Sequence, residues 1–268
     1  MMRHGRLFIL LGLSVALGAC QSVDNGPVSG QRQAALDVTS VQRTLHEPNC
    51  TDDGCAQVTA DYVRFDNAPA LSAALEQRLI EMASGFGDGS ADGHEREARQ
   101  ATPATLEAYA RRFFAEARRA RNDYPQTAPY DASLSAKVVA DHDGLLVVEL
   151  NDYVFTGGAH GMPVTAYMVF DQRQRRIVTL DDMLLAGRRA AFHAALERAH
   201  RRWLETIQQD EAFATQWPLP FSDNVAPLEA DVAVKYQAYD LGPYALGQPA
   251  LHIPYAELNG VFKPRYLH

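Results

Sequence analysis

The chain has 268 residues, of which 47% are hydrophobic and 22% charged, a composition typical of a globular protein. Its formal net charge is −8, and loss of the two arginines in the first 19 residues would bring it to −10. An acidic surface repels nucleic-acid backbones and anionic glycans, so we expect no nucleic-acid partner and favour basic partners.

The first 20 residues have the order of an exported bacterial lipoprotein. Two arginines, Arg3 and Arg6, precede the apolar segment Leu7–Leu17, which is too short to cross a bilayer as a helix. The small residues that follow end in Cys20, the position at which a lipobox cysteine is lipidated. We therefore predict a signal peptide over residues 1–19 and a lipid such as palmitate on Cys20. An ordinary signal with a chance cysteine is the alternative.

The residues after Cys20 indicate a location. Gln21 and Ser22 follow Cys20, and neither is an aspartate. In a Gram-negative cell this favours sorting to the outer membrane. Buried CH₂ groups of the acyl chains, each worth about 0.8 kcal/mol, would hold the protein at that membrane while its body faces the periplasm. We predict a flexible tether over residues 20–45, which are low in hydrophobicity.

Two further cysteines lie close together in the sequence. Cys50 and Cys55 are part of a polar loop, and the oxidising periplasm favours a bond between such thiols. A structural zinc site is the rival interpretation, but two thiolates without a nearby histidine or second cysteine pair lack the four ligands it needs. We predict a disulfide here, and we expect no metal and no cofactor.

The spacing of apolar residues predicts an α+β fold, with antiparallel sheets packed against two or three amphipathic helices. Residues 57–65 alternate like a half-buried strand, and apolar residues recur at helical spacing over residues 71–82. A second helix is expected to begin near Pro103. Its five arginines should form a solvated face, because Glu107 and Glu116 lie among them.

From residue 133 onward, the sequence indicates strands joined by hairpin turns, followed by a long amphipathic helix. Asp181 is the expected cap of a short helix before it. We divide the body into two halves, residues 46–130 and 131–268. The expected strands cover residues 133–140, 145–155, 165–170, 229–239 and 250–253, and the long helix covers about residues 187–208.

Common catalytic motifs are absent from the sequence. It contains no G-x-S-x-G of serine hydrolases, no P-loop and no H-E-x-x-H of zinc proteases. His193 and His200 share a helix side with Glu197, but a rise of 1.5 Å per residue separates the two imidazoles by roughly 10 Å. That distance is too long for one ion to bind both. We expect both histidines on the helix surface.

The stretch Tyr153–Gly161, YVFTGGAHG, contains the remaining candidate for chemistry. Gly157, Gly158 and Gly161 can take positive φ in a tight connection between two strands. His160 would need a second group to orient it or to receive its proton before it could act in catalysis. The alternative, which we favour, is that a hydrogen bond from the His160 side chain pins the turn.

Three stretches of the chain resemble a known extracytoplasmic domain. They read NDYVFTGGAHG, IVTLDDML and KYQAYDLGPYALGQPALHIPYAEL, at residues 151–161, 177–184 and 235–258. Their pattern is similar to that of domain of unknown function 3298, which is shared by the lysozyme-sensing anti-sigma factor RsiV and the non-catalytic N-terminal part of the peptidoglycan deacetylase PdaC. The region that begins near residue 57 resembles the companion domain found upstream of it.

The resemblance implies binding without catalysis. One family member binds lysozyme and another associates with cell-wall enzymes, whereas the transmembrane helix of RsiV-like proteins is replaced here by a lipobox. The chain also ends at His268 without the metal-binding catalytic domain of the deacetylase. We therefore expect that the protein is not an enzyme and that regulated cleavage is not its mode of action.

The expected function is that of a lipid-anchored periplasmic binding protein whose partner is a basic protein such as lysozyme, or peptidoglycan. A cell-wall hydrolase that uses His160 and a purely structural envelope lipoprotein are the alternatives. Tyr239 and Tyr255 are expected in the core, whereas Tyr153 fits the core and an interface equally well. The residues expected to bind are Tyr153, Thr156, Gly157, Gly158, His160 and Tyr244.

Overall fold

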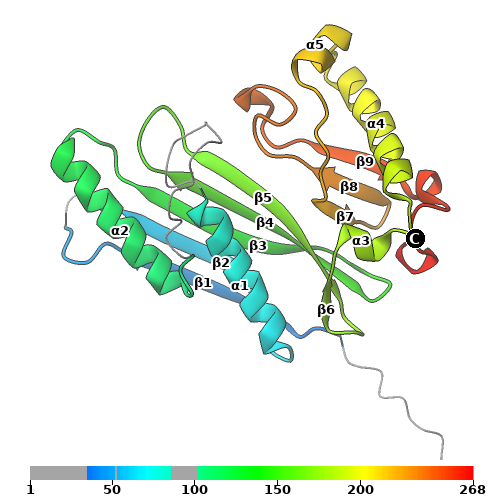
Figure 1. The fold of residues 1–268 in the computed structure, drawn as a ribbon. Helices are drawn as coiled ribbons and strands as arrows, with labels where there is room; N and C mark the ends of the chain where they lie inside the picture. Colours follow the sequence, from blue (N-terminus) through cyan, green and yellow to red (C-terminus); the bar gives the residue numbers. More distant parts are fainter. Residues whose placement is uncertain (1–34, 52, 86–101, 268) are drawn as a thin grey trace, which may run out of the picture. The chain divides into compact units, whose positions relative to one another are not determined.

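The computed structural model describes residues 35–51, 53–85 and 102–267, and the predicted signal peptide and Cys20 lie outside these ranges. The described residues confirm the α+β fold, with one six-stranded and one three-stranded sheet (Figure 1). Within this part of the chain, no helix has the length and apolarity that a membrane span requires.

The larger sheet has its strands in chain order, and all neighbouring pairs but one are antiparallel. The exception is the parallel pair β2–β3, which the two intervening helices make possible by returning the chain to the same end of the sheet. The bounds are β1 Val38–His46, β2 Gln57–Phe65, α1 Pro69–Ser84, α2 Leu106–Asp123, β3 Asp131–His142, β4 Leu145–Phe155, β5 Met162–Asp171 and β6 Arg176–Val178.

The second part of the body holds the smaller sheet and the remaining helices. Its strands have the order β7-β8-β9, and α4 packs against β9 and the following 3₁₀ turn. The strand expected over residues 229–239 is shorter than predicted, and β7 was not foreseen. The bounds are α3 Leu180–Met183, α4 Arg189–Thr206, α5 Glu211–Gln216, β7 Val225–Pro227, β8 Asp231–Lys235, η1 Tyr244–Leu246, β9 Ala250–Pro254, η2 Tyr255–Leu258 and η3 Pro264–Tyr266.

Two apolar cores lie on opposite faces of the larger sheet. On β4, Leu146, Val148 and Leu150 belong to the core formed with α1 and α2. Leu145 and Val147 belong to the core formed with α4 and the smaller sheet. Successive side chains of a strand point to opposite faces, so β4 contributes to both cores at once. Strands from both sides of residue 131 belong to the same larger sheet. The division of the body into halves at that residue stays a prediction.

The strand β1 corrects the expectation of a flexible tether over residues 20–45 for its last part, residues 38–45, whereas residues 20–34 lie outside the described ranges. It begins at Val38 and pairs with β2 along its whole length. Only Val41 and Leu45 pack against the core, so the apolar alternation of this edge strand is too weak to predict it from the sequence. The ladder with β2 is what fixes these residues.

The chain is clamped just before β1. Leu36 is buried, and its N–H donates to Oε1 of Gln172 at 2.9 Å. The side chain of Asn67 accepts from Asp37 N–H at 3.0 Å and donates to the Ala35 carbonyl at 2.9 Å. We call Leu36, Asn67 and Gln172 the entry clamp. It joins the start of β1 to the turns that follow β2 and β5.

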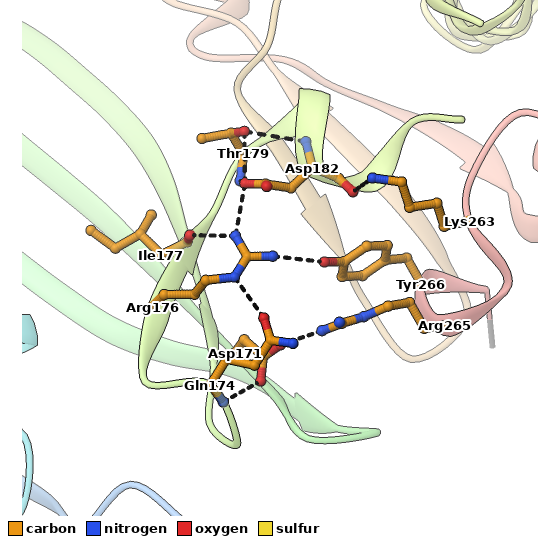
Figure 2. A network of polar contacts seen from close by, with 9 residues as sticks. All are labelled: Asp171, Gln174, Arg176, Ile177, Thr179, Asp182, Lys263, Arg265 and Tyr266. Carbon is orange, nitrogen blue, oxygen red and sulfur yellow. Dashed lines mark hydrogen bonds and ion pairs between the residues drawn. The ribbon is translucent and has the colours of Figure 1, made fainter. Parts of the chain in front are cut away.

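Thr179, and not Asp181 as expected, caps α3. Thr179 Oγ1 accepts from Asp182 N–H at 3.3 Å, while Oδ2 of Asp182 accepts from Thr179 N–H at 2.9 Å, which is a capping box. Asp182 also pairs with Arg176 at 3.0 Å (Figure 2). Hydrogen bonds from the backbone and hydroxyl of Thr179 hold the pKa of Asp182 below its usual value, and the pairing with Arg176 adds to this.

The same network fastens the C-terminal segment, as Figure 2 shows. Lys263 Nζ donates to the Asp182 carbonyl at 2.7 Å, and Arg265 pairs with the buried carboxylate of Asp171. Burial would raise the pKa of Asp171, but hydrogen bonds from Gln174 N–H and Arg265 outweigh it and lower the pKa. Each carboxylate is therefore satisfied by local partners, which indicates a structural role.

His200 corrects the expectation that both histidines of α4 lie on the helix surface. Its exposed fraction is 7%, and its ring stacks on that of Trp203 with centroids 5.7 Å apart. Burial lowers the pKa of His200, and the charge of Arg201 adds to this effect. The helix thus buries a neutral imidazole, and His193 remains half-buried beside Glu197 at 3.2 Å.

The loop between β1 and β2 is fastened to α2. Cys50 and Cys55 are joined by a disulfide, with their Cα atoms 5.6 Å apart. Arg121 donates to both carboxylate oxygens of Glu47, at 2.8 and 2.5 Å, and to the Gly54 carbonyl at 3.1 Å. Glu47 is 3% exposed, so part of the arginine face of α2 is engaged with a buried carboxylate and is not simply solvated as expected.

A carboxyl group is buried in the core formed with α1 and α2. Asp152, on β4, is 2% exposed, and neither of its carboxylate oxygens has a hydrogen-bond partner among the described residues. Burial raises the pKa of Asp152 to about 8, and the nearby backbone N–H groups of Ser135 and Ala83 and the charge of Arg78 offset this only in part. The folded protein therefore prefers the neutral carboxylic acid.

The substitution Asp152→Asn should change how stability depends on pH. Because the pKa of Asp152 is raised on folding, the free energy of unfolding of the native sequence should fall as pH rises from about 4 to about 8. The asparagine variant lacks this loss and should gain on the order of 4–6 kcal/mol relative to the native sequence between these pH values. Urea unfolding at several pH values measures both slopes, and equal slopes would contradict the argument.

Candidate functional site

The stretch TGGAHG forms the connection between β4 and β5, which confirms the predicted hairpin. Gly157 and Gly158 have φ values of 92° and 90°, a region that other residues rarely adopt. The loop therefore needs glycine at both positions, as the sequence suggested. Thr156 and Gly157 are half-buried at the base of the loop, whereas Gly158 is exposed.

Gly161 is required for a different reason from the one expected. Its φ is not positive, but a β-carbon at this position would lie 2.5 Å from Cζ of Tyr153. The Gly161 N–H donates to the Tyr153 hydroxyl at 3.0 Å. Glycine thus allows the ring of Tyr153 to lie directly against the backbone where β5 begins.

The side chain of His160 pins this end of the loop. Its Nδ1 lies 3.0 Å from the Gly161 carbonyl, which can only accept, so Nδ1 carries the proton. Tyr244, from η1, donates its hydroxyl to the same carbonyl at 3.0 Å. The rings of His160 and Tyr244 stack with centroids 3.9 Å apart. One backbone carbonyl is therefore bonded from two elements that lie far apart in the sequence.

Tyr239 completes the group and corrects the expectation that this residue lies in the core. It is 44% exposed, has a φ of 72°, and its hydroxyl lies 3.3 Å from Nε2 of His160. Its ring centroid lies 5.7 Å from that of Tyr244. Tyr255, by contrast, is buried as expected and donates to the Leu228 carbonyl at 2.6 Å.

We call Tyr153, His160, Tyr239 and Tyr244 the aromatic cluster. Tyr153 is 38% exposed, so the cluster presents aromatic surface while hydrogen bonds hold its members in place. Desolvation, with a smaller contribution from the neighbouring hydroxyls of Tyr153 and Tyr239, raises the pKa of Tyr244. Its hydroxyl is thus a neutral hydrogen-bond donor at neutral pH.

The described hydrogen bonds of His160 join neutral groups. The hydrogen bonds of its ring join a backbone carbonyl and a tyrosine hydroxyl, and no carboxylate is among its partners in this part of the chain. Within the same residues, no three histidine, cysteine, aspartate or glutamate side chains gather as a metal site would require.

Of the six predicted binding residues, the structure brings three into contact: Tyr153, His160 and Tyr244. Thr156, Gly157 and Gly158 shape the loop and do not belong to the aromatic cluster. Sequence reasoning missed Tyr239 as a member, although the Asp-Leu-Gly-Pro turn that follows it was a usable signal. Its position beside His160 depends on the fold of the second half and could not be read from spacing.

Comparison with known proteins supports the resemblance noted above. A family model described as Deacetylase PdaC matches residues 50–163, and one described as a protein of unknown function, DUF3298, matches residues 181–256. A crystal structure of a DUF3298 family protein from Pseudomonas aeruginosa PAO1 is 34% identical, with a TM-score of 0.73 over 88% of this chain and 98% of that one. The chain belongs to the DUF3298 family.

Membership of the DUF3298 family and the PdaC match make this an extracytoplasmic protein of the cell envelope. A second DUF3298 structure, from Bacteroides fragilis, has a TM-score of 0.64 over 88% of this chain and 96% of that one. At 19% identity it supports the shared fold alone. No functionally curated protein matches the chain.

The substitution Gly161→Ala should destabilise the protein, because the added methyl group would overlap the ring of Tyr153. Overpacking of this kind typically costs about 1–3 kcal/mol. Chemical denaturation should show this loss in the native background and a much smaller one in a Tyr153→Ala background, where the ring is absent. Equal losses in the two backgrounds would show that the contact is not the reason for glycine.

Proposed function

We propose that this protein is a lipid-anchored receptor of the cell envelope that binds a cell-wall-active protein such as lysozyme and does not catalyse a reaction. The observation that carries the proposal is the aromatic cluster, in which the exposed Tyr153 and the half-buried Tyr244 bond to the backbone of Gly161 and the exposed Tyr239 lies beside His160. The four residues of the cluster belong to neither apolar core, so packing of the cores does not explain them. The cluster has the properties of a binding surface.

Aromatic side chains favour binding for two physical reasons. Tyrosines bury a large area in an interface and are enriched among the residues that contribute most of the binding energy. The cluster is also fixed before binding, since Tyr153 and Tyr244 each bond to the backbone of Gly161. A fixed surface loses little conformational entropy when a partner docks.

The charge of the protein favours a basic partner. A mature chain of net charge −10 would attract a strongly basic protein and raise the association rate at low salt. Lysozymes are commonly basic proteins, and a family that includes a lysozyme-binding member makes this class of partner the first to test. Peptidoglycan is the other partner that a cell-envelope location makes available.

The proposal that the protein is not an enzyme is supported by the contacts of His160. A histidine in acid–base catalysis is normally oriented by a second polar group and left open toward the substrate. Both ring nitrogens of His160 are instead used within the aromatic cluster. Its contacts favour a role in holding the loop.

Binding should depend on the aromatic cluster. Removal of the Tyr239 and Tyr244 side chains by alanine substitution should weaken lysozyme binding about 30-fold or more, as for residues that contribute about 2 kcal/mol or more to an interface. Titration calorimetry with the soluble body and hen lysozyme would measure the change. Tyr124→Ala is the matched control, because Tyr124 is 72% exposed and lies outside the cluster, at the end of α2.

Three outcomes of that titration are informative. Weaker binding in the cluster variants alone supports the proposed receptor surface, and a further loss with added salt supports the role of charge. An equal effect of Tyr124→Ala would contradict the assignment of the surface. If the protein did not bind lysozyme but was retained on insoluble peptidoglycan, the partner would be the cell wall and not a protein.

The lipid anchor is tested separately by Cys20→Ser. A lipidated protein should sediment with membranes, whereas the serine variant, which lacks the thiol, should appear in the soluble periplasmic fraction. Immunoblots of fractionated cells measure this distribution. Recovery of both proteins in the membrane fraction would contradict anchoring through Cys20.

A further inference from the structure

One edge of the larger sheet has an incomplete ladder. The strand β5 pairs with β4 from Met162 to Asp171, but β6 covers its other edge only at residues 169–171. Along residues 161–167, that edge has no strand partner among the described residues. We call this stretch the β5 edge. Its backbone groups must find other hydrogen-bond partners or meet water.

Side-chain amides from the second half of the chain satisfy this edge. Gln237 Oε1 accepts from Thr165 N–H at 3.0 Å, and its Nε2 donates to the Thr165 carbonyl at 2.7 Å. Asn224 Oδ1 accepts from Tyr167 N–H at 2.7 Å, and its Nδ2 lies 3.3 Å from the Thr165 carbonyl. A side-chain amide offers the same donor and acceptor as a peptide group. Gln237 and Asn224 therefore stand where a neighbouring strand would make its bonds.

The β5 edge continues to the aromatic cluster. Pro163 has no N–H to offer, as is common at a sheet edge. Two residues before Pro163, the Gly161 carbonyl accepts from Tyr244 and His160. Every described bond of this edge is thus made by a side chain, and side chains can move aside without unfolding a strand.

A groove of about 480 Å³ follows the β5 edge, a size common for ligand sites. Its lining includes residues 165–169 of β5, residues 220–225, Lys235–Gln237 and Arg78 of α1. The groove therefore runs along backbone groups that are already aligned for a ladder.

The charges around the groove favour a basic occupant. Lys235 is paired with Glu149, and Arg78 lies 3.7 Å from Glu81, so both cations have a carboxylate beside them. Asp223 and Asp240 also line the groove, so when Glu149 and Glu81 are counted beside it, four carboxylates outnumber the two cations. Basic side chains on a segment in the groove would be attracted to it.

We propose that the groove binds an extended, basic segment of a partner protein, which adds to β5 as a strand and displaces the amides of Gln237 and Asn224. Strand addition of this kind takes its affinity from main-chain hydrogen bonds and its specificity from alternate side chains. The side-chain bonds that it replaces are individually modest, at about 0.5–1.5 kcal/mol each. The proposal does not require lysozyme to be the partner.

A synthetic peptide tests the proposal directly. The probe is an eight-residue peptide of alternating valine and lysine with a fluorescent label, and fluorescence anisotropy measures its binding to the soluble body. A second peptide carries N-methyl groups on alternate backbone amides, which removes hydrogen-bond donors but keeps charge and side chains. The native protein should bind the first peptide at least about 10-fold more tightly than the second, the equivalent of about 1.4 kcal/mol.

Variants of the two amides sharpen the test. Gln237→Ala and Asn224→Ala should tighten binding of the unmethylated peptide about 3- to 10-fold, because the peptide no longer competes with the side chain. Gln248→Ala is the matched control, since Gln248 contacts Gln237 and no β5 contact is described for it. Hydrogen exchange at the amides of Thr165 and Tyr167 should speed up in the Gln237 and Asn224 variants, respectively, and slow again when the peptide is added.

The outcomes separate this proposal from simpler ones. Equal binding of the two peptides would show attraction by charge alone and would overturn strand addition. Absence of binding by the native protein and by both amide variants would show that the two amides only guard the edge, and would also overturn it. Because the native protein alone can give the decisive comparison, the test stands if a variant fails to fold. Loss of lysozyme binding would leave this result unaffected.

Discussion

The hydrogen bonding of the β5 edge is the constraint on which the arrangement of the molecule depends. A strand buried on both faces must still satisfy its outward N–H and C=O groups, and β6 is too short to do so. Gln237, Asn224 and Tyr244 supply the missing bonds from segments that follow the larger sheet in sequence. The smaller sheet is therefore joined to the larger one through side chains as well as through an apolar core. Such side-chain bonds fix which residues of the two sheets face each other, yet each bond can break without the others.

The aromatic cluster follows from the same constraint at the first residues of β5. Gly161 has to approach Tyr153 closely, its carbonyl has to be bonded, and Tyr244 and His160 meet that requirement from outside the sheet. Tyr153 and Tyr244, which bond to this backbone, both remain partly exposed to solvent. A structural need and an exposed recognition surface thus coincide in one loop. This explains why a histidine in a conspicuous motif need not be a catalyst.

Much of the fold could be predicted from periodicity, because a strand or helix with one strongly apolar face has a regular spacing of apolar residues in the sequence. The predicted bounds of β2 and β4, residues 57–65 and 145–155, are those of the structure. β1 could not be predicted, since only its pairing with β2 orders so polar a sequence. In the site, the hairpin and its glycines were predictable from local turn chemistry. The partnership of His160 with Tyr239 was not, because 79 residues separate them and tertiary packing alone joins them.

The entry clamp has a mechanical consequence. Under the proposed anchoring at Cys20, a pull from the membrane would reach residues 35–37 before β1, and Asn67 and Gln172 hold these residues. An edge strand pulled from its end would otherwise separate from its neighbour one pair at a time, which requires little force. With the clamp in place, the load passes first to the turns after β2 and β5 and is shared among several strands. A body anchored as proposed would therefore resist tension between the membrane and a bound partner.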